Sequence, residues 1–578
     1  MEEKLEYKKY LDLKLKYEEK VNRIAGIRLI TFFILIMSFI LKYYYYPIFF
    51  QVVFFISLFS FLILIVIHDK YFKLFHYYEQ YFMVIENYCQ RKRGEWKNFS
   101  DTGEEFLDEK NNYLRDLDVL GKNSLFQYLS VCKTLGGKRI LSKKLSNPKL
   151  SAVQLKEEQL AIKEISQNKK FMIDYQVELM AYENKEMDLG NVFSMYAKEN
   201  SSLIHDYFLA IVCSILLFVF LGLAFFQVIQ IQYFYGLFLF NYALSFMYSL
   251  IYQEDFEKIT RFIRTYHQIP LLAEVIEREN FSSSKLFRIK KEVSKVKKVT
   301  KKLQLLDTLN SIKDNLLFNF LGNGFFCINL ISRSYFFYFL KKYFPQLKVS
   351  IFDIEEIEAF ISLAGIGLLK EEVCLPSRVD EVEIRMEGIK HPLLAENVCV
   401  ANDFVSGANV NIITGSNMGG KTSFLRTVGI NLILMNAGTF VCASSFSASY
   451  FKIFTSMRVG DDIEKGISTF YGELLRIKEA MEYLEKGNML VLIDEIFKGT
   501  NYQDRIYGAK KVIQKLQNKQ VITLLTTHDF ELCDEKNITN YHVKEYYVKD
   551  QIRFDYKIRK GKCTSTNAKY LMEKLGII

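Results

Sequence analysis

The sequence predicts a multidomain fold with α-helical transmembrane hairpins, an all-α part and a C-terminal α/β domain. Three observations support this class. Four apolar runs lie along the chain as two close pairs, and each run is long enough to cross a hydrocarbon core of ~30 Å. The long segments beside them are charged and have the spacing of amphipathic helices. After Lys370, short β-rich runs alternate with helical ones, which is typical of a parallel sheet.

The composition narrows the class of protein. A length of 578 residues leaves room for several domains. Nine cysteines occur without a C-x-x-C pair or a nearby histidine set, which argues against a zinc site or a disulfide framework and favours a reducing compartment. The net charge of +10 is compatible with a nucleic acid or an anionic membrane as partner and does not choose between them.

The first pair of apolar runs, residues 24–41 and 48–67, predicts a transmembrane hairpin over residues 24–67. Four tyrosines at 43–46 lie in the turn, where membrane proteins place an interfacial aromatic belt. The alternative is a buried hairpin of a soluble protein, which the lack of a polar stripe in either run disfavours. Residues 1–23 carry charges of both signs and predict a cytoplasmic N-terminal helix.

The second pair of runs, residues 207–229 and 233–252, predicts another transmembrane hairpin over residues 207–252. The two hairpin turns hold a single lysine, Lys42, whereas the large segments are rich in Lys and Arg. The positive-inside rule therefore places the large segments in the cytoplasm. We expect a multi-pass protein of the cytoplasmic membrane, with the lipid bilayer as a partner.

Residues 68–206 and 253–370 predict a helical, soluble part in two pieces. The second piece contains a basic run, residues 288–302, with eight basic side chains against one acidic side chain. Ile289 and Val293 continue an apolar stripe through this run, so the lysines would lie on the opposite face. Such a face can bind DNA phosphates or anionic lipid, or it can simply be solvated.

Residues 316–340 are strongly aromatic but contain four polar interruptions. Polar side chains at bilayer depth are costly, so a fifth transmembrane span is disfavoured. We expect a helix that packs in protein or lies at the membrane surface. The interrupting residues are Asn319, Asn323, Asn329 and Arg333.

A glycine-rich stretch follows an apolar run at residues 412–425, which read IITGSNMGGKTSFL. Its spacing fits G-x-x-x-x-G-K-[ST] between a strand and a helix. In such a loop, backbone N–H groups turn onto phosphates, the lysine adds positive charge and the hydroxyl can hold Mg²⁺. The alternative is a chance glycine-rich turn. The predicted ligands of ATP, with Mg²⁺ on Thr422, are Gly415, Ser416, Asn417, Met418, Gly419, Gly420, Lys421, Thr422 and Ser423.

Two further apolar runs end in residues that suit catalysis. The run 489–493 has the length of a buried strand and ends at Asp494 and Glu495. Asp494 is expected to hold Mg²⁺ and Glu495 to orient or deprotonate the attacking water. The run 521–527 ends at His528, which can sense or polarise the γ-phosphate. The alternatives are an acidic pair that merely closes a strand and a structural histidine.

Ser468 and Thr469 lie between the two nucleotide motifs and open a predicted helix over 470–485. The preceding stretch lacks the L-S-G-G-Q signature of ABC transporters. A hydroxyl and free helix N–H groups suit an anion, although a plain helix cap is the alternative. If this surface faces away from its own glycine-rich loop, Ser468 would act in a second copy, which predicts an ATP-bridged homodimer.

Together these motifs resemble the MutS family of ATPases. The family's loop pattern T-G-x-N-M-G-G-K-[ST] matches residues 414–422, and its D-E-[IL]-x-[RK]-G-T run matches 494–500. Its T-T-H-[DY]-F-E-L and S-T-F-x-x-E-[LM] patterns match 526–532 and 468–474. His391 and Asn402 resemble residues that flank the family's adenine pocket. The segments that resemble the two ends of the core and lever domain and the C-terminal dimerisation helices are 134–148, 354–364 and 561–578.

The resemblance implies a C-terminal α/β P-loop NTPase (ABC-like ATPase) domain over 371–560 and a core and lever domain in two pieces, 68–206 and 253–370. It also implies ATP hydrolysis in a homodimer, coupled to DNA binding of the mismatch-repair class. Nothing before residue 123 resembles a mismatch-reading domain, and the hairpin 207–252 stands where the family inserts a DNA clamp. The competing hypothesis is a membrane-remodelling or transport ATPase that uses a MutS-like engine without DNA.

Overall fold

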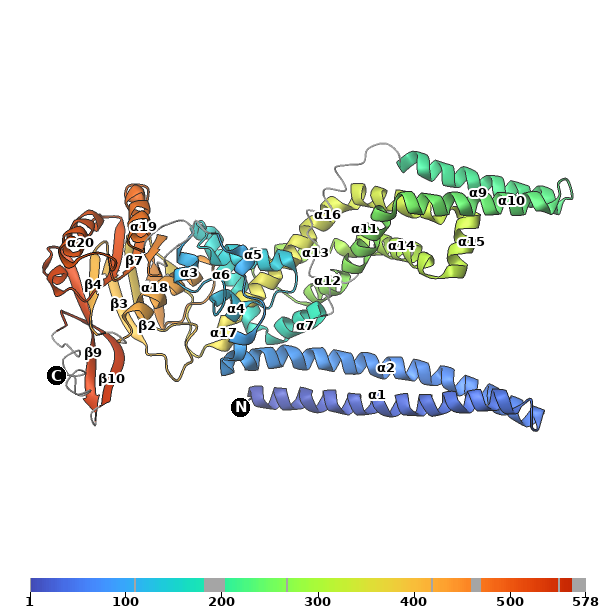
Figure 1. Ribbon diagram of the computed structural model, residues 1–578, viewed down its shortest axis with the longest axis horizontal. Helices are drawn as coiled ribbons and strands as arrows, with labels where there is room; N and C mark the ends of the chain where they lie inside the picture. The colour runs from blue at the N-terminus through green and yellow to red at the C-terminus, as the bar shows by residue number, and fades with distance from the viewer. Residues whose placement is uncertain are drawn as a thin grey trace. The chain divides into compact units, whose positions relative to one another are not determined.

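The computed structural model describes residues 2–108, 111–180, 203–266, 269–416, 419–458, 469–548 and 551–563 (Figure 1). The chain divides into two compact units. One comprises Met1–Trp96 and Lys169–Ala181, and the other comprises Lys97–Asn168 and Tyr182–Ile578.

The first unit is a long helical hairpin. Helix α1 (Glu2–Leu41) and helix α2 (Pro47–Arg93) lie side by side, and α7 (Lys169–Met180) packs against α2. The charged N-terminal segment and the first apolar run form one continuous helix, because no proline interrupts residues 2–41. Stacked rings join the two long helices near the charged end, with the Tyr10 and Tyr81 centroids 4.2 Å apart.

The described residues of the second unit are helical over the predicted hairpin 207–252 and most of the predicted helical piece 253–370, as expected. The membrane-like pair is α9 (Leu203–Phe225) and α10 (Ile231–Ile251). The remaining α-helices before the sheets are α3 (Tyr113–Asp116), α4 (Leu125–Leu129), α5 (Leu135–Leu145), α6 (Ala152–Gln167), α11 (Gln253–Tyr266), α12 (Ile269–Arg278), α13 (Ser284–Val293), α14 (Val296–Asp314), α15 (Leu316–Phe326), α16 (Ile328–Ala364) and α17 (Ile366–Leu369). Short 3₁₀ helices are η1 (Glu95–Asn98), η2 (Glu104–Phe106) and η3 (Phe530–Asp534).

Four helices in the described part of the chain are long and apolar enough to cross a membrane by length and composition. They are α1, α2, α9 and α10, which cover most of the four predicted runs; α9 ends at Phe225, four residues before the predicted end of its run. Their apolar side chains are largely exposed, which is the opposite of what water-facing helices show.

Helix α16 continues for 37 residues and joins the helical bundle to the C-terminal sheets (Figure 1). Near its end, the buried Glu358 carboxylate accepts hydrogen bonds from the backbone N–H groups of Lys133 and Thr134 at 3.1 and 3.2 Å. Thr134 also caps α5. The Thr439 hydroxyl donates to the Leu363 carbonyl at 2.9 Å. The end of α16 is therefore fixed to both α5 and the α/β part.

The main C-terminal sheet has six strands in the order β10-β9-β4-β8-β7-β6. The pairs β9–β4, β4–β8, β8–β7 and β7–β6 are parallel, as expected, and only the edge hairpin β9–β10 is antiparallel. The strands are β4 (Val410–Thr414), β6 (Lys452–Ser456), β7 (Met489–Asp494), β8 (Val521–Thr526), β9 (Ile538–Val548) and β10 (Gln551–Lys560), and the helices between them are α18 (Lys421–Asn436), α19 (Thr469–Tyr483) and α20 (Tyr502–Leu516).

A second sheet of four strands, in the order β1-β5-β2-β3, packs beside the first and was not expected from the sequence. Its strands are short and mostly antiparallel: β1 (Ser377–Arg378), β2 (Glu383–Ile389), β3 (Asn402–Gly407) and β5 (Ser445–Ala448).

The central strands of the main sheet place the residues that follow them along one edge of the sheet. Strands β4 and β8 are buried along their whole length, which requires cover on both faces. Since β4, β7 and β8 run parallel, their carboxyl ends meet at one edge of the sheet. Ligands of α/β proteins bind at this edge.

Candidate functional site

The glycine-rich loop leaves β4 at Thr414 and enters α18 at Lys421. Gly415 and Gly420 have φ angles of 139° and 89°, which side chains rarely adopt. A Cβ atom on Gly415 or Gly419 would lie 2.4 or 2.6 Å from the Val543 side chain of β9. The loop is thus pressed against β9 and only glycine fits there. The predicted ligands Asn417 and Met418 lie outside the described residues.

Lys421 is buried at the start of α18, and its ammonium points back into the loop. Its Nζ donates to the carbonyls of Gly415 and Ser416 at 2.8 and 2.9 Å and lies 3.3 Å from His528 Nε2. Burial lowers the pKa of Lys421, while Glu495 and Asp494 oppose that shift. The Ser416 hydroxyl is buried without a hydrogen-bond partner among the described residues. A buried cation beside an unpaired hydroxyl fits the oxygens of a phosphate.

Asp494 ends β7 and lies directly beside α18. The Thr422 hydroxyl donates to its carboxylate at 2.9 Å, and the Thr526 hydroxyl of β8 donates at 2.6 Å. This pairing brings together the two residues predicted to hold Mg²⁺. Oxygen-only donors suit Mg²⁺, so the residues present fit that ion.

Glu495 follows Asp494 in a left-handed conformation, with φ of 59°. Its backbone N–H donates to the Thr526 carbonyl at 3.1 Å, which fixes the turn at the strand end. The carboxylate lies 3.3 Å from His528 Nε2 and 3.6 Å from Lys498 Nζ. The hydrogen bond with His528, helped by the charge of Lys498, lowers the pKa of Glu495 to about 2. A carboxylate with this pKa orients a water molecule well and is a weak proton acceptor.

The other predicted site residues are more scattered. Ser423 lies on the first turn of α18 and is exposed. His391 is buried and its Nδ1 accepts from the Leu393 N–H at 3.2 Å, and burial lowers its pKa to about 3. Both amide atoms of Asn402 bond to the backbone of β10 at Tyr556 and Ile558. Ser468, and residues 564–578 of the expected dimerisation segment, lie outside the described residues.

Tyr556 is a neighbour of the loop that the sequence did not single out. Its ring would lie 3.0 Å from a Cβ atom on Gly420. The side chain is exposed and the backbone has φ of 55°, at an irregularity in the β9–β10 pairing. One tyrosine among 37 gives no sequence signal, because only the bulge in β10 turns this ring toward the loop.

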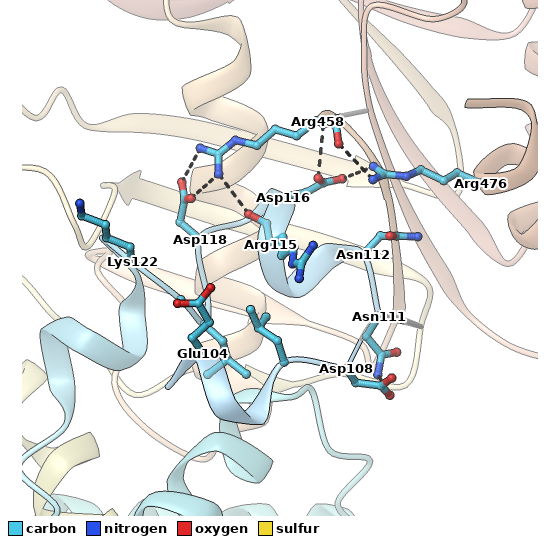
Figure 2. A pocket seen from close by; sticks show the side chains of 13 residues that line it. Glu104, Asp108, Asn111, Asn112, Arg115, Asp116, Asp118, Lys122, Arg458 and Arg476 are labelled. Atoms are coloured by element: carbon cyan, nitrogen blue, oxygen red, sulfur yellow. Dashed lines mark hydrogen bonds and ion pairs between the residues drawn. The ribbon is translucent and has the colours of Figure 1, made fainter. Parts of the chain in front are cut away.

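An acidic turn at Asp116 and Asp118 lies beside the end of β6, and Figure 2 shows Asp118 facing Arg458 and Asp116 facing Arg476. Asp116 is 1% exposed and accepts from the Thr455 hydroxyl at 2.7 Å and from Arg476 at 2.8 Å. Asp118 accepts from Arg458 at 2.6 Å and from Arg426 at 3.1 Å. The turn therefore ties the end of β6 to α18 and α19. It borders a polar cavity of about 620 Å³.

The basic run 288–302 folds as parts of two helices, α13 and α14, instead of one. Ile289 and Val293 are buried as expected. The exposed basic side chains described on the other face are Arg288, Lys291, Lys295, Lys297 and Lys302. Two of them pair with acids, Lys295 with Glu292 at 2.5 Å and Lys297 with Glu277 at 3.9 Å. The face is thus basic but partly neutralised.

Comparison with known proteins finds relatives for the C-terminal part of the chain. The model of MutS domain V matches residues 411–573. The DNA mismatch repair protein MutS of Aquifex pyrophilus is 32% identical over 219 residues, which cover 36% of this chain and 25% of that protein. MutS of Staphylococcus epidermidis is 31% identical, covering 38% and 27%. The mouse MutS protein homolog 4 is 36% identical over 190 residues, covering 30% and 19%.

The matched region holds the glycine-rich loop, Asp494, Glu495 and His528. The chain spans only about a quarter of the length of the MutS proteins it matches, so the likeness concerns one part of the molecule. The C-terminal part of the chain, residues 411–573, is thus similar to domain V of the MutS proteins.

Proposed function

We propose that this protein is a membrane-anchored ATPase that binds and hydrolyses ATP as a dimer and couples the ATP state to DNA binding. The single observation that carries the proposal is the convergence of Lys421, Thr422, Asp494, Glu495 and His528 at one sheet edge, although they come from three separate stretches of chain.

Each side chain has a distinct task in this proposal. Lys421 exchanges its bonds to the Gly415 and Ser416 carbonyls for bonds to the β- and γ-phosphates of ATP, which restores a favourable environment for its buried charge. Thr422 and Asp494 hold Mg²⁺, which when bound neutralises charge on the phosphates.

Glu495 orients the attacking water, and His528 sits between Glu495 and Lys421 as a link to the γ-phosphate. Because Glu495 is a weak base, its main contribution is to position the water in line with the phosphorus, and the proton leaves on the phosphate product. Tyr556, which lies over Gly420, offers a ring face for the adenine base.

Dimer formation is supported by the exposed surface of α19. Tyr471, Leu474 and Leu475 are exposed on the first turns of this helix. Apolar side chains in such a row favour a protein partner. A second copy seated here would bring Ser468, just before α19, to the neighbouring ATP.

DNA binding is supported by two observations. The relatives of the C-terminal part are named as DNA mismatch repair proteins. The basic face of α13 and α14 has the charge to contact DNA phosphates. We therefore assign the protein to a mismatch-repair-related function, with α1, α2, α9 and α10 as its anchor in the cytoplasmic membrane.

The test is the ATPase rate of the full chain in nanodiscs, with and without duplex, mismatched and branched DNA. Glu495→Ala should lower the rate by about 10²-fold, because the attacking water loses its position. The matched control Glu485→Ala, an exposed acid just after α19, should leave the rate unchanged. DNA should raise the rate, and the effect should weaken steeply with salt. Turnover that ignores every DNA at low salt would reject the DNA coupling and favour a membrane-remodelling or transport role.

A further inference from the structure

Helix α15 and the start of α16 form a broken helix beside the second hairpin (Figure 1). The break is at Cys327, which is fully buried and has left-handed dihedral angles of 48° and 49°. The expected single helix over 316–340 is therefore two helices. Both pack against α9 and α10.

The contact between α15 and α10 is close. A Cβ atom on Gly324 would lie 2.2 Å from the Phe238 ring, so only glycine fits. The Phe320 ring centroid lies 5.3 Å from that of Phe238 and 5.0 Å from that of Tyr242. Phe238 and Tyr242 lie in the middle of α10, away from either end of the helix. If α10 crosses a membrane, α15 lies at membrane depth.

The polar interruptions of this region point inward and find partners. Asn323 Oδ1 accepts from the Ser245 hydroxyl at 2.6 Å and from the Asn329 N–H at 3.0 Å. Asn329 donates to the Ser245 carbonyl at 3.1 Å, and Asn241 donates to the Gly324 carbonyl at 3.3 Å. Two backbone groups at the break, the Asn329 N–H and the Gly324 carbonyl, are thus met by side chains within the protein, while the amide oxygens of Asn241 and Asn329 are buried without a hydrogen-bond partner among the described residues. Irregular backbone at bilayer depth is tolerated where protein groups meet it in this way.

Arg333 is the last of these inward-facing polar side chains, and it lies at the end of the bundle where α9 and α11 begin. Its guanidinium is 1% exposed and lies 2.8 Å from Asp255 and 3.2 Å from Asp206. These acids stand at the start of α11 and α9, on the side of the soluble part. Between Asp314 and Arg333 the sequence has no charged residue.

The outward face of α15 is apolar and uncovered. Leu316, Leu317 and Phe318 are 90%, 61% and 58% exposed, and Leu321 and Phe326 are also exposed. Helices α9 and α10, which pack against α15, also expose many apolar side chains. In water so many exposed apolar side chains would be unfavourable, whereas acyl chains match them.

We propose that α15 is a re-entrant membrane helix, which enters the bilayer beside α10, turns at Cys327 and returns through the first turns of α16, with lipid acyl chains on its outward face. This inference rests on the proposed membrane anchor. It places residues 316–340 in contact with lipid acyl chains, although their polar residues argue against a full transmembrane span.

The test uses tryptophan fluorescence of the full chain in liposomes of phosphatidylcholine with brominated or unbrominated acyl chains. The chain has one tryptophan, Trp96, so the parent protein supplies a constant background. Three variants are compared: Phe318→Trp on α15, Phe240→Trp on α10 and Phe287→Trp on α13, all at exposed positions. We expect brominated lipid to quench the added emission of Phe318→Trp as much as that of Phe240→Trp, and to spare that of Phe287→Trp.

The outcomes separate the two proposals. Quenching of Phe240→Trp without quenching of Phe318→Trp would overturn the re-entrant helix and leave the anchor intact. Quenching of neither would overturn the anchor itself. A second pair guards against misfolding: Leu317→Asp should reduce the amount of protein recovered in the membrane, whereas Phe287→Asp, equally exposed but on α13, should not. Equal recovery of both variants would count against lipid contact at α15.

Discussion

Two regions of this molecule place polar side chains in apolar surroundings, the loop edge of the main sheet and the bundle of α9, α10, α15 and α16. At the sheet edge the polar residues come in short runs at the ends of buried strands. In the bundle they come singly, from helices up to 127 residues apart in the chain, as with Asp206 and Arg333. A short stretch of sequence is therefore enough to recognise the polar site at the sheet edge. The same kind of reading is misleading for the polar cluster in the bundle.

The reason is the geometry of each element. Parallel strands bring their ends to one edge, so a motif after a strand already tells where its side chains lie. A helix presents a polar residue once in several turns, and its partner stands on another helix that the sequence does not indicate. Asn323 and Asn329 therefore look costly in the sequence, although each has a partner on α10.

The largest effect expected from this comparison is at Arg333. Arg333→Leu leaves Asp206 and Asp255 without their cation, and loss of one partner from a buried ion pair costs about 3–5 kcal/mol. The thermal midpoint of the full chain in detergent should fall accordingly. Arg278→Leu removes an exposed pair with Glu274, worth about 0–1 kcal/mol, and is the control. Similar midpoints for both variants would show that the bundle does not depend on its charged cluster.

A somewhat smaller effect is expected at Lys421. Lys421→Met keeps the length of the side chain but removes the charge aimed into the loop, and loss of one such preorganised group costs about 10²–10³-fold in kcat. The ATPase assay of the full chain measures this. Lys486→Met changes an exposed lysine after α19 and should leave kcat unchanged. Retained turnover in Lys421→Met would separate the loop from catalysis.

A substitution in the acidic turn tests whether a single polar residue contributes to the free energy of unfolding near the sheet, as Arg333 is expected to do in the bundle. Asp116→Asn weakens charged hydrogen bonds to Thr455 and Arg476, each worth about 1.5–3 kcal/mol, so a loss in that range is expected. Urea unfolding of the detergent-held chain, followed by tyrosine fluorescence, reports it. Glu104→Gln, at the rim of the same cavity, supplies the control. An unchanged midpoint in Asp116→Asn would contradict a structural role for the turn.

The smallest effect concerns His391, whose pKa falls from 6.5 to about 3 on folding. Below pH 6.5 the unfolded chain binds a proton that the folded chain refuses, so stability falls as the pH decreases from 6.5 toward 3. Between pH 6.5 and 5.5 this amounts to about 1 kcal/mol. His391→Gln should remove that part of the slope in thermal unfolding. The same slope in both proteins would mean that His391 titrates normally.

The sequence predicted the elements that repeat a simple pattern. The four apolar runs, the parallel strands and the loop between β4 and α18 all lie where expected. The second sheet was missed because β1 and β5 are short and widely separated in the chain. Asp116 was missed because its partners, Thr455 and Arg476, are more than 300 residues away. The turn at Cys327 was missed because the left-handed residue is a cysteine, while the nearest glycine, Gly324, lies three residues earlier inside α15.

Helix α16 gives the molecule a mechanical property. At 37 residues it is a rod of ~55 Å, clamped by Arg333 near one end and by Glu358 and Leu363 near the other. When both ends of a helix are fixed, a relative movement of the ends must be taken up by bending within the helix, and the helix bends at its weakest turn. That turn is set by Pro345, which has no N–H to donate to the preceding turn. Stiffness between the bundle and the sheets is therefore adjustable at a single residue, and Pro345→Ala would tighten the linkage without touching either end.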